Sequence, residues 1–207
     1  MRVSLGVTPA RRTLKLAEYA LTTIGAFALG YCLAVFIEVK AYQDFEARDF
    51  AKELRLKETT TSAPVDSVTT LATLSKHGVV GRLEIPRLSV SVMVVEGVDD
   101  SDLKRAVGHI PGTALPGELG NVGIAGHRDT FFRPLRSIHC DDTITVSTLH
   151  GAYRYRVVST NVVRPEDIQV LYPTGRASLT LVTCFPFDYV GSAPKRFIVR
   201  ADRAPGI

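Results

Sequence analysis

The hydrophobic residues near the start of the chain form one uninterrupted stretch. No residue from Tyr19 to Ile37 is charged, and these 19 positions approach the roughly 20 residues that a helix needs to cross a bilayer core. The stretch has no polar face to meet solvent, unlike a helix of a soluble protein, and it is longer than the apolar region of a cleaved signal peptide. The pattern therefore predicts a single transmembrane helix over residues 19–37.

The charges on either side of this stretch differ. The segment that follows mixes acidic and basic residues, whereas the segment before it carries a cluster of basic residues, Arg2, Arg11, Arg12 and Lys15. Basic residues accumulate on the cytoplasmic side of membrane helices. We therefore expect a single-pass protein of the cytoplasmic membrane, with residues 1–18 inside and the domain after the helix extracytoplasmic.

Residues 38–75 change from a charged helical pattern to a polar segment without periodicity. Residues 41–57 keep helical spacing and predict a short solvated stalk. Residues 58–70, ETTTSAPVDSVTT, predict a flexible tether. We therefore expect a stalk and linker over residues 38–75 and a folded domain over residues 76–204.

Within that domain the apolar residues occur in short runs rich in Val, Ile, Leu and Tyr, separated by Gly, Pro and Asp. Such runs predict strands, while Asp100–Val107 predicts a short helix and Pro165 opens another turn. Many short strands with little helix favour a closed barrel or a sandwich. The predicted strands are Val79–Ile85, Val90–Val95, Asn121–Ala125, Thr143–Thr148, Ala152–Val163, Ser178–Thr183 and Arg196–Ala201.

The composition narrows the class of protein. An apolar fraction of 45% with 22% charged residues is typical of a folded chain. The net charge of +4 comes from scattered basic residues, so no nucleic-acid partner is expected. Three widely spaced cysteines, Cys32, Cys140 and Cys184, favour neither a disulfide framework nor a zinc motif.

Cys184, His127 and Arg196 are the candidates for catalysis. Cys184 ends the strand-like run SLTLVT, and His127 follows the similar run NVGIAG. A nucleophilic thiol needs a partner that favours the thiolate and protonates the leaving group, and an imidazole can do both. Arg196 begins the next strand and is suited to stabilising an oxyanion. Spacing alone does not distinguish these roles from an inert thiol, a hydrogen-bonded histidine and a surface cation.

The sequences around these three residues resemble one family. TLVTC at residues 180–184 resembles the TLxTC signature of sortases. The catalytic histidine of that family is matched at GHRD, residues 126–129, and its arginine at PKRFIV, residues 194–199. The resemblance extends from about Gly81 to Arg200 and is most similar to class D.

The resemblance implies a mainly β fold, a closed eight-stranded sortase-type β-barrel with one or two short helices, preceded by the transmembrane helix. It implies a cysteine transpeptidase in which Cys184 attacks a threonine carbonyl of an LPxTG-like sorting signal. His127 would act as general acid and base, and Arg196 would support the oxyanion. The implied partners are exported proteins with a C-terminal sorting signal and an amine acceptor, either a peptidoglycan precursor or a protein lysine. We expect no cofactor and no metal.

Two other functions remain compatible with the sequence. A Cys-His peptide hydrolase would use the same residues and pass the acyl group to water. A non-catalytic anchored β-domain would bind a surface polymer, although the complete set of thiol, imidazole and guanidinium favours an enzyme. A zinc hydrolase built on His127, Asp129 and His139 lacks a second closely spaced ligand pair.

Overall fold

The computed structural model describes residues 9–60 and 78–204. These residues belong to two compact units that divide between Ala41 and Tyr42. The long helix α1, Pro9–Thr60, contains both the predicted span and the predicted stalk. Most of the predicted tether, residues 61–70, lies outside the described residues.

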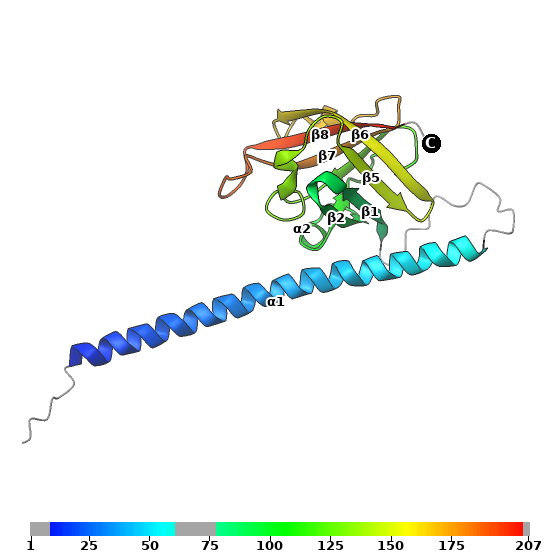
Figure 1. Ribbon diagram of the computed structural model, residues 1–207. Helices are drawn as coiled ribbons and strands as arrows, with labels where there is room; N and C mark the ends of the chain where they lie inside the picture. The colour runs from blue at the N-terminus through cyan, green and yellow to red at the C-terminus, as the bar shows by residue number, and fades with distance from the viewer. Residues whose placement is uncertain (1–8, 61–77, 205–207) are drawn as a thin grey trace, which may run out of the picture. The chain divides into compact units, whose positions relative to one another are not determined.

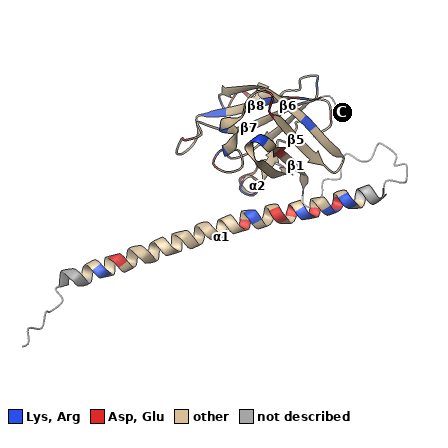
Figure 2. Ribbon diagram, viewed as in Figure 1, with Lys and Arg blue, Asp and Glu red and all other residues tan. Residues whose placement is uncertain are grey.

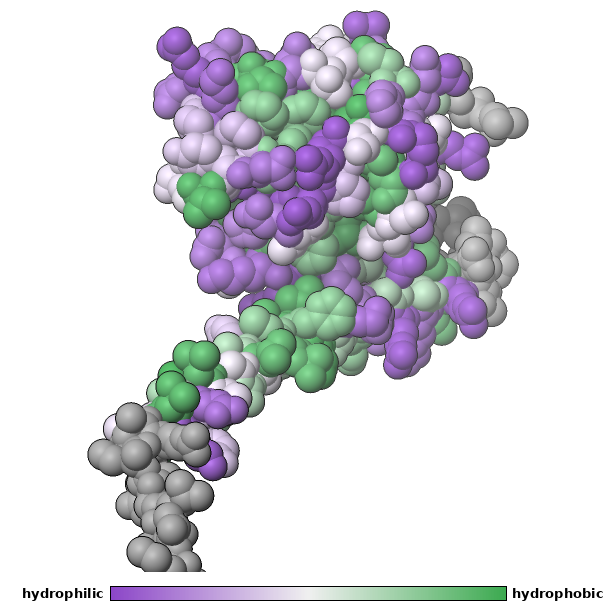
Figure 3. Space-filling view, turned by 60° about the vertical axis from the view of Figure 1, so that its left-hand side comes forward, coloured by the Kyte–Doolittle hydropathy of each residue, from purple (hydrophilic) through white to green (hydrophobic). Residues whose placement is uncertain are grey.

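The first unit contains the apolar part of α1. The side chains of residues 13–37 are all exposed. Figure 2 shows a long uncharged stretch of α1 followed by closely spaced acidic and basic residues, and Figure 3 shows hydrophobic residues on the helix surface. Among the described helices, α1 alone is long and apolar enough to cross a membrane, although a signal sequence near the N-terminus can have the same properties.

The second unit contains a closed eight-stranded barrel (Figure 1), as the resemblance implies. Its strands follow the order β1-β2-β3-β4-β7-β8-β6-β5, and β5 pairs with β1 to close the barrel. The helical segments are α2 (Asp100–Leu103), η2 (Pro86–Leu88), η3 (Arg133–Ser137) and η4 (Ile168–Leu171). The strands are β1 (Val79–Ile85), β2 (Val90–Glu96), β3 (Val107–His109), β4 (Asn121–Ala125), β5 (Thr143–Thr148), β6 (Gly151–Val163), β7 (Ser178–Phe185) and β8 (Lys195–Arg203).

Seven of these strands coincide with predicted ones to within two residues at each end, and β3 was not predicted. The predicted helix over Asp100–Val107 is wrong in its last part, because α2 ends at Leu103 and Val107 begins β3. A strand of three residues is too short to show alternation. β3 exists because it fills the place between β2 and β4, parallel to the first and antiparallel to the second.

The barrel interior is filled by one side-chain face of each long strand. In β5, for example, Ile144 and Val146 are buried while Thr143 is exposed, as expected for residues that alternate between the two faces of a strand. Leu179 and Leu181 of β7 also lie in the main core cluster. Since successive side chains alternate, Cys184 of β7 lies on the opposite, outer face of the barrel wall.

A smaller hydrophobic cluster includes the last part of α1. Phe50 is buried with Val79, Met93, Val95 and Ala106, and further α1 side chains pack around it. Within this unit the Gln43 side chain also accepts a hydrogen bond from the backbone N–H of Met93 at 2.9 Å. The segment predicted as a solvated stalk therefore has one face against the barrel, and the compact unit begins at Tyr42.

An arginine–aspartate pair joins η2 to the start of β5. The Arg87 guanidinium donates to both carboxylate oxygens of Asp142. The backbone N–H of His139 also donates to that carboxylate at 2.8 Å. The hydrogen bond from Arg87 lowers the pKa of Asp142, burial opposes this effect, and the His139 amide adds to the lowering. This side of the barrel therefore depends on an ionised aspartate.

Candidate active site

The ends of two parallel strands bring His127 and Cys184 close along the barrel rim. Ala125 of β4 is in register with Val182 of β7, and the Gly126 N–H donates to the Val182 carbonyl at 3.1 Å. The Thr183 hydroxyl donates back to the Gly126 carbonyl at 2.7 Å. His127 directly follows Gly126 and Cys184 directly follows Thr183, so both residues lie next to this pair of hydrogen bonds.

Arg196 lies opposite Cys184 on the neighbouring strand. β7 and β8 are antiparallel, and Cys184 and Arg196 are partners in their register. Directly opposite residues in an antiparallel pair present their side chains on the same face, with Cβ atoms about 5 Å apart. The structure therefore brings all three predicted residues to one end of the barrel, although they come from separate segments of the chain.

The three side chains are all partly exposed, as a site open to substrate requires. The Arg196 guanidinium uses Nη1 to donate to the carbonyls of Ala193 and Lys195, at 3.2 and 3.0 Å. Within the described part of the chain, the ring of His127 has no hydrogen-bond partner. All three cysteines are free, and Cys140 is exposed and donates to the Val158 carbonyl at 3.5 Å.

Gly126 has a packing role. A Cβ atom at this position would lie 2.7 Å from Phe132 Cδ2 and 2.9 Å from Val107 Cγ1. The backbone N–H of Phe132 also donates to the His127 carbonyl at 3.1 Å. The turn that contains His127 is thus packed closely against the side chains of Phe132 and Val107.

Asp100 is a carboxylate whose electrostatic environment includes His127. Asp100, in the first turn of α2, pairs with Lys104 at 2.9 Å. The hydrogen bond and charge of Lys104 lower the pKa of Asp100, burial opposes them, and the charge of His127 contributes in the lowering direction.

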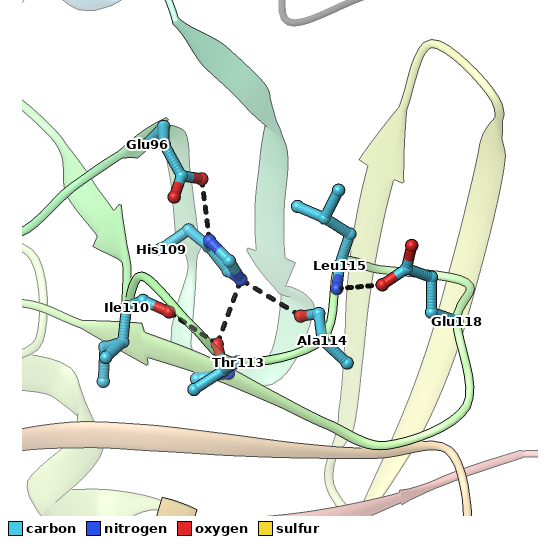
Figure 4. Close-up of polar contacts among 8 residues, drawn as sticks. Glu96, His109, Ile110, Thr113, Ala114, Leu115 and Glu118 are labelled. Carbon is cyan, nitrogen blue, oxygen red and sulfur yellow. Dashed lines mark hydrogen bonds and ion pairs between the residues drawn. The ribbon is translucent and has the colours of Figure 1, made fainter. Parts of the chain in front are cut away.

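A second histidine, His109, has a contrasting environment (Figure 4). It is 2% exposed, and its Nδ1 lies 2.7 Å from a carboxylate oxygen of Glu96. Its Nε2 lies 3.0 Å from both the Ala114 carbonyl and the Thr113 hydroxyl, whose own hydrogen goes to the Ile110 carbonyl. Both ring nitrogens are therefore used inside the protein, and no sequence motif distinguishes His109.

The other histidines and aspartates near the motifs have local partners or lie elsewhere. Among the described residues, His139 contacts Arg87, and no group of three His, Cys, Asp or Glu side chains is arranged to hold a metal ion. Asp188 pairs with Arg136 at the surface. His77 lies outside the described residues.

Asn121 is a site-shaping residue that sequence reasoning missed. Its buried amide donates to the Val170 carbonyl of η4 at 3.0 Å and accepts from the Thr180 hydroxyl of β7 at 2.8 Å. It therefore holds η4 against the outer face of β7 that also carries Cys184. The available signal was an amide at the start of an otherwise apolar strand, where a buried polar group needs partners.

Comparison with known proteins identifies relatives of the barrel. The family model described as Sortase domain matches residues 83–204. Sortase D of Bacillus subtilis is 37% identical over 124 residues, which cover 59% of this chain and 63% of that protein. The chain thus spans less than two thirds of the length of that relative.

Solved structures resemble the chain as well. A Clostridium perfringens structure described as a Sortase D5 transpeptidase has a TM-score of 0.62 at 25% identity, covering 80% of this chain and 98% of that one. Sortase C-1 from Actinomyces oris has a TM-score of 0.60 at 30% identity, covering 77% and 99% of the two chains.

Proposed function

This chain belongs to the sortase family, and we propose that it is a membrane-anchored cysteine transpeptidase that joins a peptide with an LPxTG-like sorting signal to an amine. The predicted similarity to class D agrees with the identity to Sortase D of Bacillus subtilis. One observation carries the proposal: Cys184 stands opposite Arg196 on β8, and His127 follows the strand paired with β7 on its other side.

Cys184 performs the first bond exchange in the proposed mechanism. Its thiolate attacks the backbone carbonyl carbon of the threonine in the sorting signal, and the negative charge moves to the carbonyl oxygen. Arg196 donates hydrogen bonds to this oxyanion, since its guanidinium keeps its charge and offers several N–H groups. When the C–N bond breaks, His127 gives its proton to the departing amine. The product is a thioester between Cys184 and the threonine.

The second half of the reaction reverses these roles. An incoming amine attacks the thioester carbon while His127 accepts the amine proton, and the C–S bond breaks to restore the Cys184 thiolate. The acceptor is a peptidoglycan precursor or a protein lysine, and the donor is an exported protein. Both the donor and the acceptor would lie outside the cytoplasm. This location is consistent with α1 as an N-terminal anchor whose N-terminus is inside.

The test uses the full-length chain in detergent, with an LPxTG-type peptide and an added amine such as triglycine. Mass spectrometry should detect the peptide joined to the amine with wild-type protein and none with Cys184→Ala. Turnover by Cys184→Ala at the wild-type rate would exclude this mechanism. If wild type released only the hydrolysed acid at every amine concentration, the protein would be a hydrolase instead.

The membrane orientation has its own test, which uses the exposed Cys140. In intact cells that produce Cys184→Ala, a maleimide that does not cross membranes should label Cys140. Labelling that required cell lysis would place the barrel in the cytoplasm and overturn the orientation.

A further inference from the structure

The residue after the candidate catalytic histidine, Arg128, is almost completely buried. Its exposed fraction is 6%, and the proposed mechanism gives it no role. Removing a guanidinium from water costs free energy unless its N–H groups find acceptors. The environment of Arg128 should therefore reveal what the charge is used for.

The guanidinium of Arg128 is directed at one loop, residues 186–194, which joins β7 to β8. Nη1 donates to the Pro186 carbonyl at 2.8 Å. Nη2 donates to the carbonyls of Tyr189 and Gly191, the second at 3.1 Å. The guanidinium carbon also lies 5.9 Å from the centre of the Tyr189 ring, within the range of a cation–π contact. Arg128 thus holds three backbone carbonyls spread over six residues of the loop.

The remaining nitrogen of Arg128 adds little to this arrangement. Among the described residues Nε has no hydrogen-bond partner, and its ionic contact with Asp129, at 3.4 Å, is with a largely exposed carboxylate. Because exposed ion pairs contribute little, the loop carbonyls are the main compensation for burying this charge.

The loop depends on such an anchor because its tip has little packing of its own. Val190 is 96% exposed and Tyr189 is 46% exposed. At the base of the loop, the rings of Phe185, Phe187 and Phe197 contact one another. Apart from Arg128, the loop is also contacted by Arg136, through an exposed pair with Asp188, and by Arg196, through the Ala193 carbonyl.

Cys184 and Arg196 lie in the two strands that this loop connects. Cys184 is the second-last residue of β7, and Arg196 is the second residue of β8. We propose that Arg128 is a positioning residue, which holds the 186–194 loop against the turn after β4 and thereby sets Cys184 and Arg196 relative to His127. The catalytic consequence rests on the proposed transpeptidase function. The restraint on the loop does not.

The experiment compares Arg128→Lys, Arg128→Met and the control Arg136→Gln in the full-length chain in detergent. Lysine keeps the charge but loses the fork that reaches several carbonyls, and methionine keeps only the apolar stem. Arg136→Gln removes the surface contact with the same loop. Hydrogen exchange of peptides covering residues 186–194 measures the restraint, and the rate of Cys184 alkylation by iodoacetamide, relative to Cys140, measures the position of the thiol. Peptide turnover gives kcat and KM.

We expect the loop amides of both Arg128 variants to exchange hydrogen about tenfold faster than those of wild type. Such an increase corresponds to the loss of one or two charged hydrogen bonds. Their Cys184 alkylation rate relative to Cys140 should change at least about threefold, and kcat should fall about tenfold with KM changed less than about threefold. Arg136→Gln should stay within about twofold of wild type in every measurement. All assays are made well below the melting temperature of each variant, so that global unfolding does not contribute.

Two results would overturn the proposal. Unchanged loop exchange in Arg128→Lys would show that Arg128 does not restrain the loop. This variant is the milder one and serves even if Arg128→Met fails to fold. Faster loop exchange with wild-type alkylation and wild-type kcat would show that Arg128 has a structural role only. Absence of transpeptidation in wild type would refute the proposed function instead, and exchange and alkylation would still decide the role of Arg128.

Discussion

His109 in β3 and His127 in the turn after β4 have opposite relations to the protein around them. His109 on β3 is buried, with Glu96 at one nitrogen and the Ala114 carbonyl at the other. His127, after β4, is partly exposed, and its ring has no hydrogen-bond partner among the described residues. β3 and β4 pair directly, so the two environments are adjacent in the barrel. A histidine can exchange protons with a substrate only when its nitrogens are not already committed to the fold.

The same contrast holds for arginines of the rim. The Arg128 guanidinium is buried and bonded to three loop carbonyls, whereas Arg196 is partly exposed and uses one nitrogen for its own loop. Within this small region, the buried side chains that make several hydrogen bonds to the protein hold the structure. The side chains that keep free capacity are those in the proposed mechanism.

The largest effect should come from His127→Gln. Removing the proposed general acid and base should lower kcat roughly a thousandfold, since positioned proton transfer contributes between a hundred- and ten-thousandfold. The melting temperature should remain close to that of wild type, because the ring has no hydrogen bond to lose among the residues that the structure describes. Kinetics with the sorting peptide and calorimetry on the same sample would check both parts. A large loss of stability with intact kcat would reverse the roles assigned to the two histidines.

His109→Leu should show the opposite pattern. It leaves the Ala114 carbonyl without its donor and the Glu96 carboxylate without its partner, so unfolding free energy should fall by about 2 to 4 kcal/mol. At temperatures well below the melting point, kcat should stay within about twofold of wild type. Urea titration monitored by circular dichroism measures the stability. Wild-type stability in this variant would mean that the cluster in Figure 4 contributes nothing.

Arg196→Lys tests whether the fork of the guanidinium, and not only its charge, serves the reaction. We expect kcat/KM to fall about tenfold to a hundredfold, because lysine cannot hold the same hydrogen-bond geometry at the oxyanion. Stability should change little, since the side chain is partly exposed. Unchanged kinetics would remove Arg196 from the mechanism, with wild type assayed in parallel.

The smallest effect should be a pH-dependent loss of stability from the Arg87–Asp142 pair, which has no part in the proposed mechanism. The pKa of Asp142 is lowered in the folded state, chiefly by Arg87. Between that lowered value and the ordinary aspartate value of about 3.9, the unfolded chain binds more protons, so stability rises with pH. The contribution is therefore present above about pH 4 and is lost as pH falls through the folded pKa.

Asp142→Asn measures this contribution. It should melt a few degrees below wild type at pH 6, and the difference should shrink as the pH is lowered toward the folded pKa of Asp142. Melting curves of both proteins over that range make the comparison. A constant difference across the pH series would show that ionisation of Asp142 is not responsible.

Much of the barrel could be predicted because its strands have a local signature. Runs such as Thr143–Thr148 alternate between buried and more exposed side chains, and that alternation is visible without any partner strand. β3 has no such signature, because its three residues form a strand only between β2 and β4. The packed face of α1 was likewise hidden, since the charges of residues 41–57 indicate a solvated surface while Phe50 is buried against the barrel.

For the candidate site, the sequence by itself determined the residue types, their order and their place at strand ends, because motifs and apolar periodicity are local properties of the chain. It also determined that one N-terminal helix is apolar enough to cross a membrane. Only the tertiary structure decided that Cys184 lies opposite Arg196 and that Arg128 holds the loop between them. It also decided that the ring nitrogens of His109 are bonded within the fold, while the His127 ring has no hydrogen bond among the described residues. Those relations depend on strand register and on contacts between residues far apart in the chain, which no local pattern encodes.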